Sequence, residues 1–225
     1  MTRVAITTDH FDLAAPPYAA LGLDPVPVPC IRVKRAEDEV LASARAAASG
    51  ADLILISSAR TVELLWPDRA MPGVDVAAVG TVTAEAVAVA GGKVVATGHS
   101  GLAGLVETIA DRLPRARVVH PHGSMSDPVA LQRLRGLAPT LDECVVYRTV
   151  PIAPPSTPVD AVVFASPSAV EGWLLTRDFD PLVVGVIGRT TGAVVARHRP
   201  PDVIAPEPSH PALARALISY LEVKV

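Results

Sequence analysis

Several features that mark particular protein classes are scarce in this sequence of 225 residues. Aromatic residues make up only 4% of it, and there are only two cysteines. So few cysteines exclude a disulfide framework, and Cys30 and Cys144 form no metal-binding motif. We interpret both as small buried apolar residues in a reducing compartment. The core is therefore expected to consist of Ala, Val, Leu and Ile.

Long apolar runs and basic clusters are also missing. No uninterrupted apolar segment reaches the roughly 18 residues that a membrane helix needs, because Glu85 and Lys93 interrupt the longest candidate. The chain does not begin with a basic segment followed by an apolar one, so we expect no signal peptide and a cytoplasmic location. The formal net charge is −3, and no basic stripe is interleaved with aromatics. Nucleic acid and membrane are therefore not expected as partners.

What the chain does contain is an internal repeat. Residues 52–58 are echoed by 160–166, and residues 79–84 by 187–192, at a constant shift of 108 residues. A gapless shift of this kind indicates one structural unit used twice. We therefore expect function where the two copies face each other.

The apolar pattern predicts strands that alternate with helices, which is typical of an α/β fold. We expect two similar domains with parallel sheets flanked by helices, joined by a two-stranded connector. The clearest segments are strands at 4–7, 52–56, 76–79 and 94–96, and helices at 11–21, 36–48, 59–65 and 101–113, with Ser100 capping the last helix.

The domain boundaries follow from two extended segments, which we place at about 26–34 and 145–153. Prolines at 25, 27 and 29 exclude a central strand in the first segment, so it is a connector or an edge strand. Domain 1 is then discontinuous, comprising 1–32 and 153–225. Domain 2 spans 35–149.

Hydroxyls and glycines recur where predicted strands end and helices begin. One such residue is usually a helix cap, but several on one rim predict a site for a polyanion, because free N–H groups at helix N-termini attract negative charge. The predicted substrate-binding residues are Thr7, Ser57, Ser58, Thr81, Thr83, Ser100, Gly123, Ser166, Ser168, Gly188, Thr190 and Thr191.

No standard catalytic motif is present: there is no Walker loop, dinucleotide-binding fingerprint or nucleophile elbow. His120 and His122 flank a proline, but no third metal ligand is evident nearby, so we expect a solvated or ligand-facing pair and no metal site. Tyr147 lies on the second extended segment. Its phenol either donates a hydrogen bond to a leaving hydroxyl or fills the domain junction.

Five segments, taken in order, resemble the uroporphyrinogen-III synthase family. They are ILISSARTV at 54–62, AVGTVTAEA at 78–86, VVYRTV at 145–150, VFASPSAV at 163–170 and VIGRTTG at 186–192. The resemblance covers nearly the whole chain. It implies two α/β domains joined by a two-stranded connector, with the first domain built from both chain ends.

The resemblance also implies an activity and its residues. The family closes linear hydroxymethylbilane to uroporphyrinogen III without a cofactor, inverting the last pyrrole ring through a spiro intermediate. Its connector tyrosine corresponds to Tyr147, which is implied to assist hydroxide loss. Its glycine-turn threonines correspond to Thr83, Thr190 and Thr191, and its strand-end serines to Ser58, Ser166 and Ser168. Porphobilinogen deaminase is implied as a transient partner.

An alternative belongs to a different class: a non-catalytic two-lobed protein on the same scaffold that binds a polyanion or regulates. Tyr147 and both glycine-threonine turns are present together, which favours the enzyme.

Overall fold

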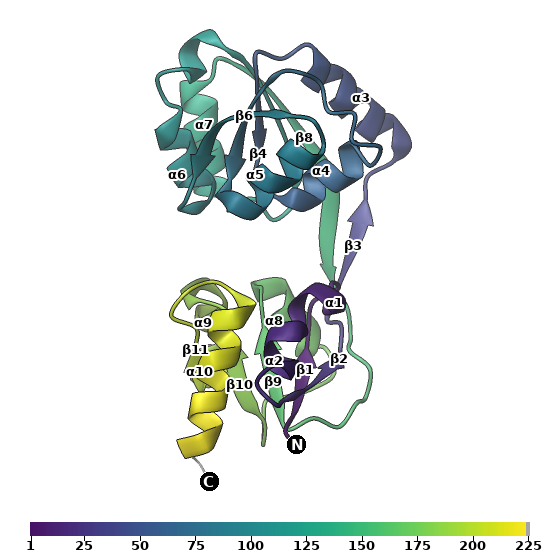
Figure 1. Cartoon of the computed structure of the whole chain (residues 1–225), viewed down its shortest axis with the longest axis vertical. Coiled ribbons are helices and arrows are strands. Elements are labelled where there is room, and N and C mark those ends of the chain that lie inside the picture. Colours follow the sequence, from purple (N-terminus) through teal and green to yellow (C-terminus); the bar gives the residue numbers. More distant parts are fainter. Residues whose placement is uncertain (224–225) are drawn as a thin grey trace. The chain divides into compact units, whose positions relative to one another are not determined.

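The structure is a computed structural model that describes residues 1–223. The chain divides into two compact units (Figure 1). Unit 1 comprises Met1–Val33 and Thr149–Val225, and unit 2 comprises Lys34–Arg148. Each unit is an α/β layer structure in which helices cover both faces of a mainly parallel sheet. This is the fold class expected from the alternating pattern.

Unit 1 contains a five-stranded parallel sheet with the order β11-β10-β9-β1-β2. Its strands are β1 (Arg3–Ile6), β2 (Asp24–Pro27), β9 (Ala161–Phe164), β10 (Val183–Val186) and β11 (Val203–Ile204). The proline-rich β2 is an edge strand, as expected, because proline cannot donate to a second neighbour. The three inner strands are buried runs of Val, Ile, Ala and Phe, typical of a sheet covered on both sides.

Side chains that alternate along the unit 1 strands pack into two cores, one on each face of the sheet. Val4 and Ile6 pack with Tyr18 and Leu213, beneath the helices α1 (Phe11–Ala14), α2 (Pro16–Ala19) and α10 (His210–Val223). On the other face Phe164 packs with its neighbours beneath α8 (Pro167–Trp173) and α9 (Arg189–Val195). Helices therefore cover both faces of the sheet, so a binding site is expected at the ends of its strands.

Unit 2 contains a six-stranded sheet with the order β3-β8-β7-β4-β5-β6. Its strands are β3 (Ile31–Arg35), β4 (Leu53–Ile56), β5 (Asp75–Val79), β6 (Lys93–Gly98), β7 (Arg117–Gly123) and β8 (Thr140–Pro151). All neighbours from β8 to β6 pair in parallel. Their carboxyl ends therefore lie at one edge of the sheet.

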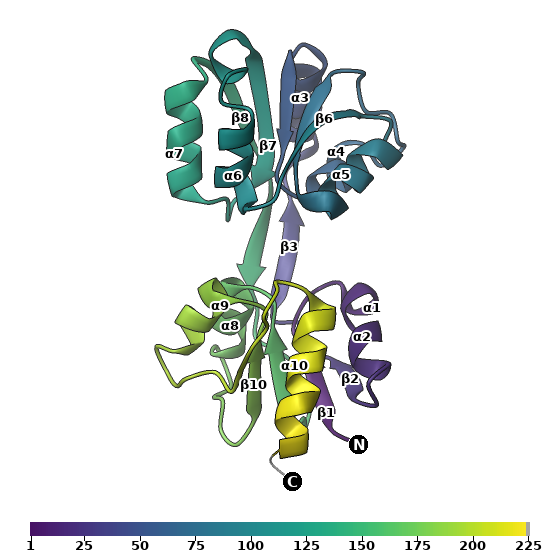
Figure 2. The ribbon, with the colours of Figure 1, turned by 60° about the vertical axis from the view of Figure 1, so that its left-hand side comes forward.

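Helices cover both faces of the unit 2 sheet, as Figure 2 shows. One face carries α3 (Asp38–Ser49), α4 (Ala59–Leu65) and α5 (Gly80–Val89) over a core that includes Ile54 and Trp66. The other carries α6 (Gly101–Thr108) and α7 (Pro128–Leu137) over a core that includes Leu55 and Leu105. The 3-10 helix η1 (Leu113–Arg115) precedes β7.

Two strands, β3 and β8, cross from one unit into the other. Ala36 N donates to Val146 O, and Ile152 N donates to Cys30 O, each at 2.9 Å. From the first hydrogen bond to the second, the residue number falls from 36 to 30 in one strand and rises from 146 to 152 in the other, so the strands run antiparallel. They form the two-stranded connector that the resemblance implied.

Two predicted helices are shorter than expected. Residues 11–21 form two separate turns, α1 and α2, because Pro16 cannot donate to the preceding turn and its ring clashes with it. The helix expected over 101–113 ends at Thr108, whose hydroxyl donates to Gly104 O at 2.8 Å. Beyond it the chain tightens into i−3 turns that lead to Pro114.

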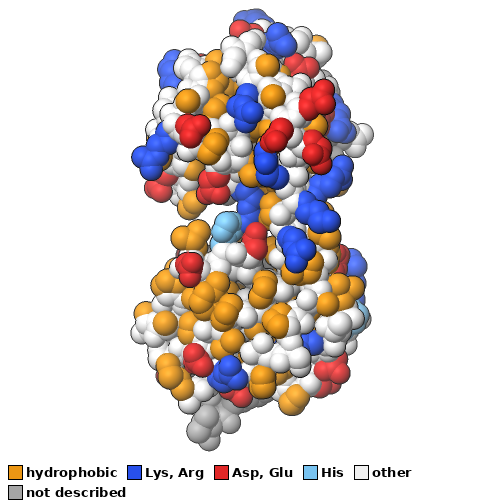
Figure 3. Space-filling model, turned by 90° about the vertical axis from the view of Figure 1, so that its right-hand side faces the viewer, with side chains coloured by type: hydrophobic (Ala, Val, Ile, Leu, Met, Phe, Trp, Pro, Cys, Tyr) orange, Lys and Arg blue, Asp and Glu red, His pale blue; other side chains and the backbone are white. Residues whose placement is uncertain are grey.

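The repeat in the sequence is a repeat of structure. β4 (Leu53–Ile56) and β9 (Ala161–Phe164) start 161 − 53 = 108 residues apart, and α4 and α8 start 167 − 59 = 108 residues apart. The surfaces of the two units differ more than their folds do. On the face in Figure 3, charged side chains are spread over unit 2, whereas hydrophobic ones cover much of unit 1.

Candidate functional site

The strand-end rim of unit 1 surrounds a cavity of about 740 Å³. Four predicted binding residues line it, supplied by the turns after β9 and β10: Ser166, Gly188, Thr190 and Thr191. Ile204 and Pro206 close the cavity from the segment around β11. Sequence reasoning missed these apolar walls, since nothing in the pattern marked that segment as part of the rim.

Some hydroxyls of the unit 1 rim are already engaged within the protein. Thr7 is 1% exposed and donates to Val163 O at 2.7 Å, so it fastens β1 to β9. Ser166 Oγ accepts from Ala169 N at 3.3 Å and lies 3.1 Å from Ser168 Oγ. Ser168 and Thr191 are also buried. Ser166 and Thr190 are the more accessible hydroxyls of this rim.

The strand-end rim of unit 2 is built by β4, β5, β6 and β7. Ser57 and Ser58 follow β4 and are half-buried, and Ser58 precedes α4 without a side-chain cap hydrogen bond. Thr81 and Ser100 are exposed at the starts of α5 and α6, and Ser100 likewise makes no cap bond. Thr83 is 6% exposed. Unlike Ser166, these serines do not cap their helices.

Tyr147 lies on β8 at this rim and is half-buried. Its ring packs against the core cluster beneath α4 and lies near the Arg60 guanidinium, whose central carbon is 5.9 Å from the ring centroid. A cation over an aromatic face is attracted to the ring quadrupole. Sequence reasoning missed Arg60, although the repeat carried a signal: the same position in the other copy is Ser168.

His120 and His122 are not solvated, which corrects the expectation from the sequence. They are 0% and 5% exposed, and their rings stack at 4.7 Å between centroids. Each Nδ1 contacts a carbonyl oxygen, of Leu55 at 3.0 Å and of Gly123 at 2.8 Å, so each Nδ1 carries the proton. Burial lowers the pKa of His120 to about 4. The pair is an internal element of β7, and His120 is neutral near pH 7.

Two kinds of feature that would imply other functions are absent from residues 1–223. No group of three or more His, Cys, Asp or Glu side chains placed to hold a metal ion occurs in that range. None of the helices described there is long and apolar enough to cross a bilayer.

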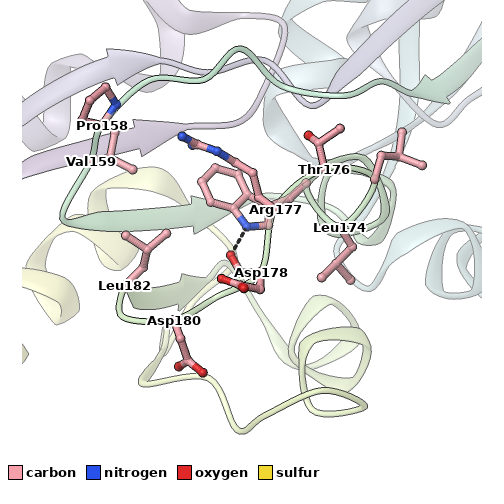
Figure 4. A pocket seen from close by; sticks show the side chains of 10 residues that line it. Pro158, Val159, Leu174, Thr176, Arg177, Asp178, Asp180 and Leu182 are labelled. Carbon is pink, nitrogen blue, oxygen red and sulfur yellow. Dashed lines mark hydrogen bonds between the residues drawn. The ribbon is translucent and has the colours of Figure 1, made fainter.

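A second cavity in unit 1, of about 560 Å³, lies at the opposite ends of β9 and β10 (Figure 4). Arg177 lies across it, with its guanidinium 4.6 Å from the Trp173 ring centroid and Nη2 donating to Thr157 O at 2.6 Å. Trp173 Nε1 donates to Asp178 O at 2.7 Å. The polar atoms here fasten the proline-rich segment before β9 to the end of α8, which is a structural role.

These observations define a class of protein: two duplicated α/β units, each with a strand-end rim of hydroxyls and helix N-termini, and a tyrosine beside one rim. The family described as HEM4, uroporphyrinogen-III synthase HemD, matches residues 14–215. The chain belongs to this family. Its family implies a small-molecule substrate.

Two solved structures support the same fold. The uroporphyrinogen-III synthetase of Helicobacter pylori 26695 matches with a TM-score of 0.69 at 17% identity, covering 97% of this chain and 98% of that one. A mutant uroporphyrinogen III synthase of the extremely thermophilic bacterium Thermus thermophilus matches with a TM-score of 0.62 at 19% identity, covering 99% and 100%. No curated protein matches the chain significantly.

Proposed function

We propose that this chain is a uroporphyrinogen-III synthase that closes hydroxymethylbilane to uroporphyrinogen III with inversion of ring D. The observation that carries the proposal is the family match over residues 14–215 on a chain that keeps Tyr147 beside a hydroxyl-rich rim. A non-catalytic polyanion-binding role would explain the rims but does not require a phenol beside one of them.

The substrate carries carboxylates along its length, and the rims offer matching groups. We propose that Ser166, Gly188 and Thr190 bind carboxylates at the unit 1 cavity, with Thr191 shaping its wall. In unit 2, Ser57, Ser58, Thr81 and Ser100 are the proposed contacts, because their hydroxyls lie at helix starts and do not cap those helices. Backbone N–H groups at such starts favour anions.

The buried hydroxyls have a supporting role in this proposal. Thr7, Thr83 and Ser168 are at most 6% exposed, so they hold the turns in shape beneath the bound carboxylates. Gly123 is buried as well.

Tyr147 is the proposed catalytic residue. Its phenol donates a proton to the leaving hydroxyl, water departs, and an azafulvene cation remains. The substituted carbon of ring D attacks this cation to give the spiro intermediate, which fragments and recloses, and the proton lost on closure returns to the phenolate. The remaining catalysis is positioning, which contributes as much as about 7–11 kcal/mol in favourable cases.

We also propose a cytoplasmic location and a transient encounter with porphobilinogen deaminase. Hydroxymethylbilane closes spontaneously to the type I isomer, so rapid transfer from the deaminase would protect the yield of type III.

A coupled assay tests the function. Hydroxymethylbilane is generated in place, the purified protein is added, the products are oxidised, and the porphyrin isomers are separated. The proposal predicts type III isomer well above the no-enzyme control. Type I alone, from a protein with an intact circular dichroism spectrum, would overturn it in favour of the binding role.

A further inference from the structure

The pairing of β7 with β8 changes register where Tyr147 lies. His122 pairs with Val145, but the next residue, Gly123, pairs with Tyr147. Val146 is therefore an extra residue in β8, which makes this a β-bulge. Bulges re-aim a side chain and are frequent beside active sites. Here the bulge places Tyr147, rather than Val146, directly opposite a glycine.

The tyrosine ring occupies the space that a side chain on Gly123 would need. A Cβ built on Gly123 would lie 2.4 Å from Cζ of Tyr147, 2.5 Å from Cε2 and 2.7 Å from the hydroxyl oxygen. These separations are far below van der Waals contact. An aromatic ring that covers a glycine on the neighbouring strand is a recognised way to pin strand register.

The backbone of Gly123 cannot retreat from the ring. Its carbonyl accepts from His122 Nδ1 at 2.8 Å and from both the backbone N and the Oγ of Ser126 at 3.2 Å. Ser124 N donates to Tyr147 O at 3.0 Å. The turn is thus fastened on several sides, whereas the far end of the tyrosine can rotate. Any atom added to Gly123 will displace the ring rather than the turn.

The structure assigns Gly123 a role different from substrate contact: we infer that it is a positioning residue that sets where the Tyr147 phenol lies. The bulge at Val146 places the ring opposite Gly123, and the ring fits there because Gly123 has no side chain. This inference rests on the proposed function of Tyr147. It revises the expectation from the sequence that Gly123 binds substrate.

The first arm of the test needs no substrate. Tyrosine-labelled protein, which has three tyrosines, is examined by NMR, and the Tyr147 ring signal is identified by its loss in Tyr147→Phe. We expect Gly123→Ala to shift this signal while those of Tyr18 and Tyr220 stay in place. Gly136→Ala, in α7 of the same unit with no atom within 4 Å of the added Cβ, is the matched control. An unmoved Tyr147 signal in folded Gly123→Ala would overturn the inference.

The second arm is a double-mutant cycle on turnover. Gly123→Ala is expected to lower kcat by roughly 10- to 100-fold, since misplacing a reacting group by about 1 Å costs that much, with little change in KM. In a Tyr147→Ala background the same substitution should lower kcat no further. An equal loss in both backgrounds would mean that Gly123 acts on the substrate directly. If the wild type makes no type III isomer, the proposed function fails while the NMR arm still decides the geometry.

Discussion

The two units share one plan, yet they use their strand-end residues differently. Their buried frames match: Leu105 in α6 and Leu213 in α10 are both fully buried, 108 residues apart. Their rims do not. Ser166 caps α8, whereas Ser58, its equivalent in unit 2, makes no side-chain cap bond to α4. Duplication preserved the packing and left the rims free to diverge.

The divergence concentrates reactive groups in unit 2. Arg60 takes the place of the buried Ser168 of unit 1 and lies over Tyr147. At the shift of 114 residues that relates β7 to β1, the counterpart of Tyr147 is Val33 and that of His120 is the buried Ile6. Unit 1 therefore offers a cavity with partly engaged hydroxyls, and unit 2 offers the tyrosine and a cation beside it.

The largest expected effect tests how closely α8 packs in unit 1. A Cβ on Gly172 would lie 1.9 Å from Cys30 O and 2.8 Å from Ile152 O, both backbone atoms of the connector. Gly172→Ala should therefore destabilise unit 1 by at least about 3 kcal/mol, the upper end of ordinary overpacking. Thermal unfolding measures this.

The matched variant is Leu64→Ala, which puts the same residue at the equivalent position of α4. Leu64 is only half-buried, so a loss of about 1 kcal/mol is expected, typical of a point substitution. Similar losses for both variants would mean that α4 and α8 pack alike and would remove this difference between the units.

Acid should loosen unit 2 more than unit 1: burial also lowers the pKa of His210 in unit 1, but His210 is only half-buried, whereas His120 is fully buried. The folded pKa of His120, about 4, lies below the value of about 6.5 in an unfolded chain. The unfolded state therefore binds the additional proton as the pH falls from about 6.5 to 4, and stability is lost over that window, by about 3 kcal/mol in total. His122 and Glu143 are the titratable groups that face this ring.

Hydrogen exchange followed by mass spectrometry separates the units. Amides of β4 and β7 should lose more protection between pH 6.5 and 4 than those of β9. His120→Asn, which retains a donor for Leu55 O, should flatten the pH dependence, and the exposed His99→Asn should not. An unchanged pH profile in His120→Asn would mean that a group other than His120 causes the acid sensitivity.

A smaller effect distinguishes the two strand-end serines. Ser166→Ala removes a helix cap, so it should cost about 1 kcal/mol of stability. Ser58→Ala removes a hydroxyl that caps nothing, so stability should be unchanged while KM rises severalfold. Urea unfolding and steady-state kinetics measure the two quantities. If Ser58→Ala loses as much stability as Ser166→Ala, Ser58 stabilises its helix as Ser166 does, and the two rims do not differ in this respect.

Much of the fold could be predicted from the sequence because a repeat constrains it twice. The helix at 59–65 was predicted with its observed ends, and the proline-rich segment at 25–33 was correctly kept out of the sheet interior. The helix expected at 11–21 was wrong because Pro16 and Pro17 outweigh the apolar periodicity.

The site was harder to predict, because position along a strand does not reveal burial or register. Thr7 was expected at the rim, and it does follow β1, but its hydroxyl is used within the sheet. The stacking of His120 on His122 depends on tertiary packing. The bulge at Val146 adds one residue to β8 without any sequence signal, and that residue decides which side chain faces Gly123.

The most direct test of the account is the isomer-resolved turnover of Tyr147→Phe, with Tyr18→Phe, which removes a buried hydroxyl in unit 1, as control. The proposed proton donor lies in unit 2 alone. Tyr147→Phe should therefore lower kcat on the order of 10²-fold, with KM and thermal stability close to the wild type, and Tyr18→Phe should leave kcat unchanged. Wild-type kcat in folded Tyr147→Phe would contradict the account.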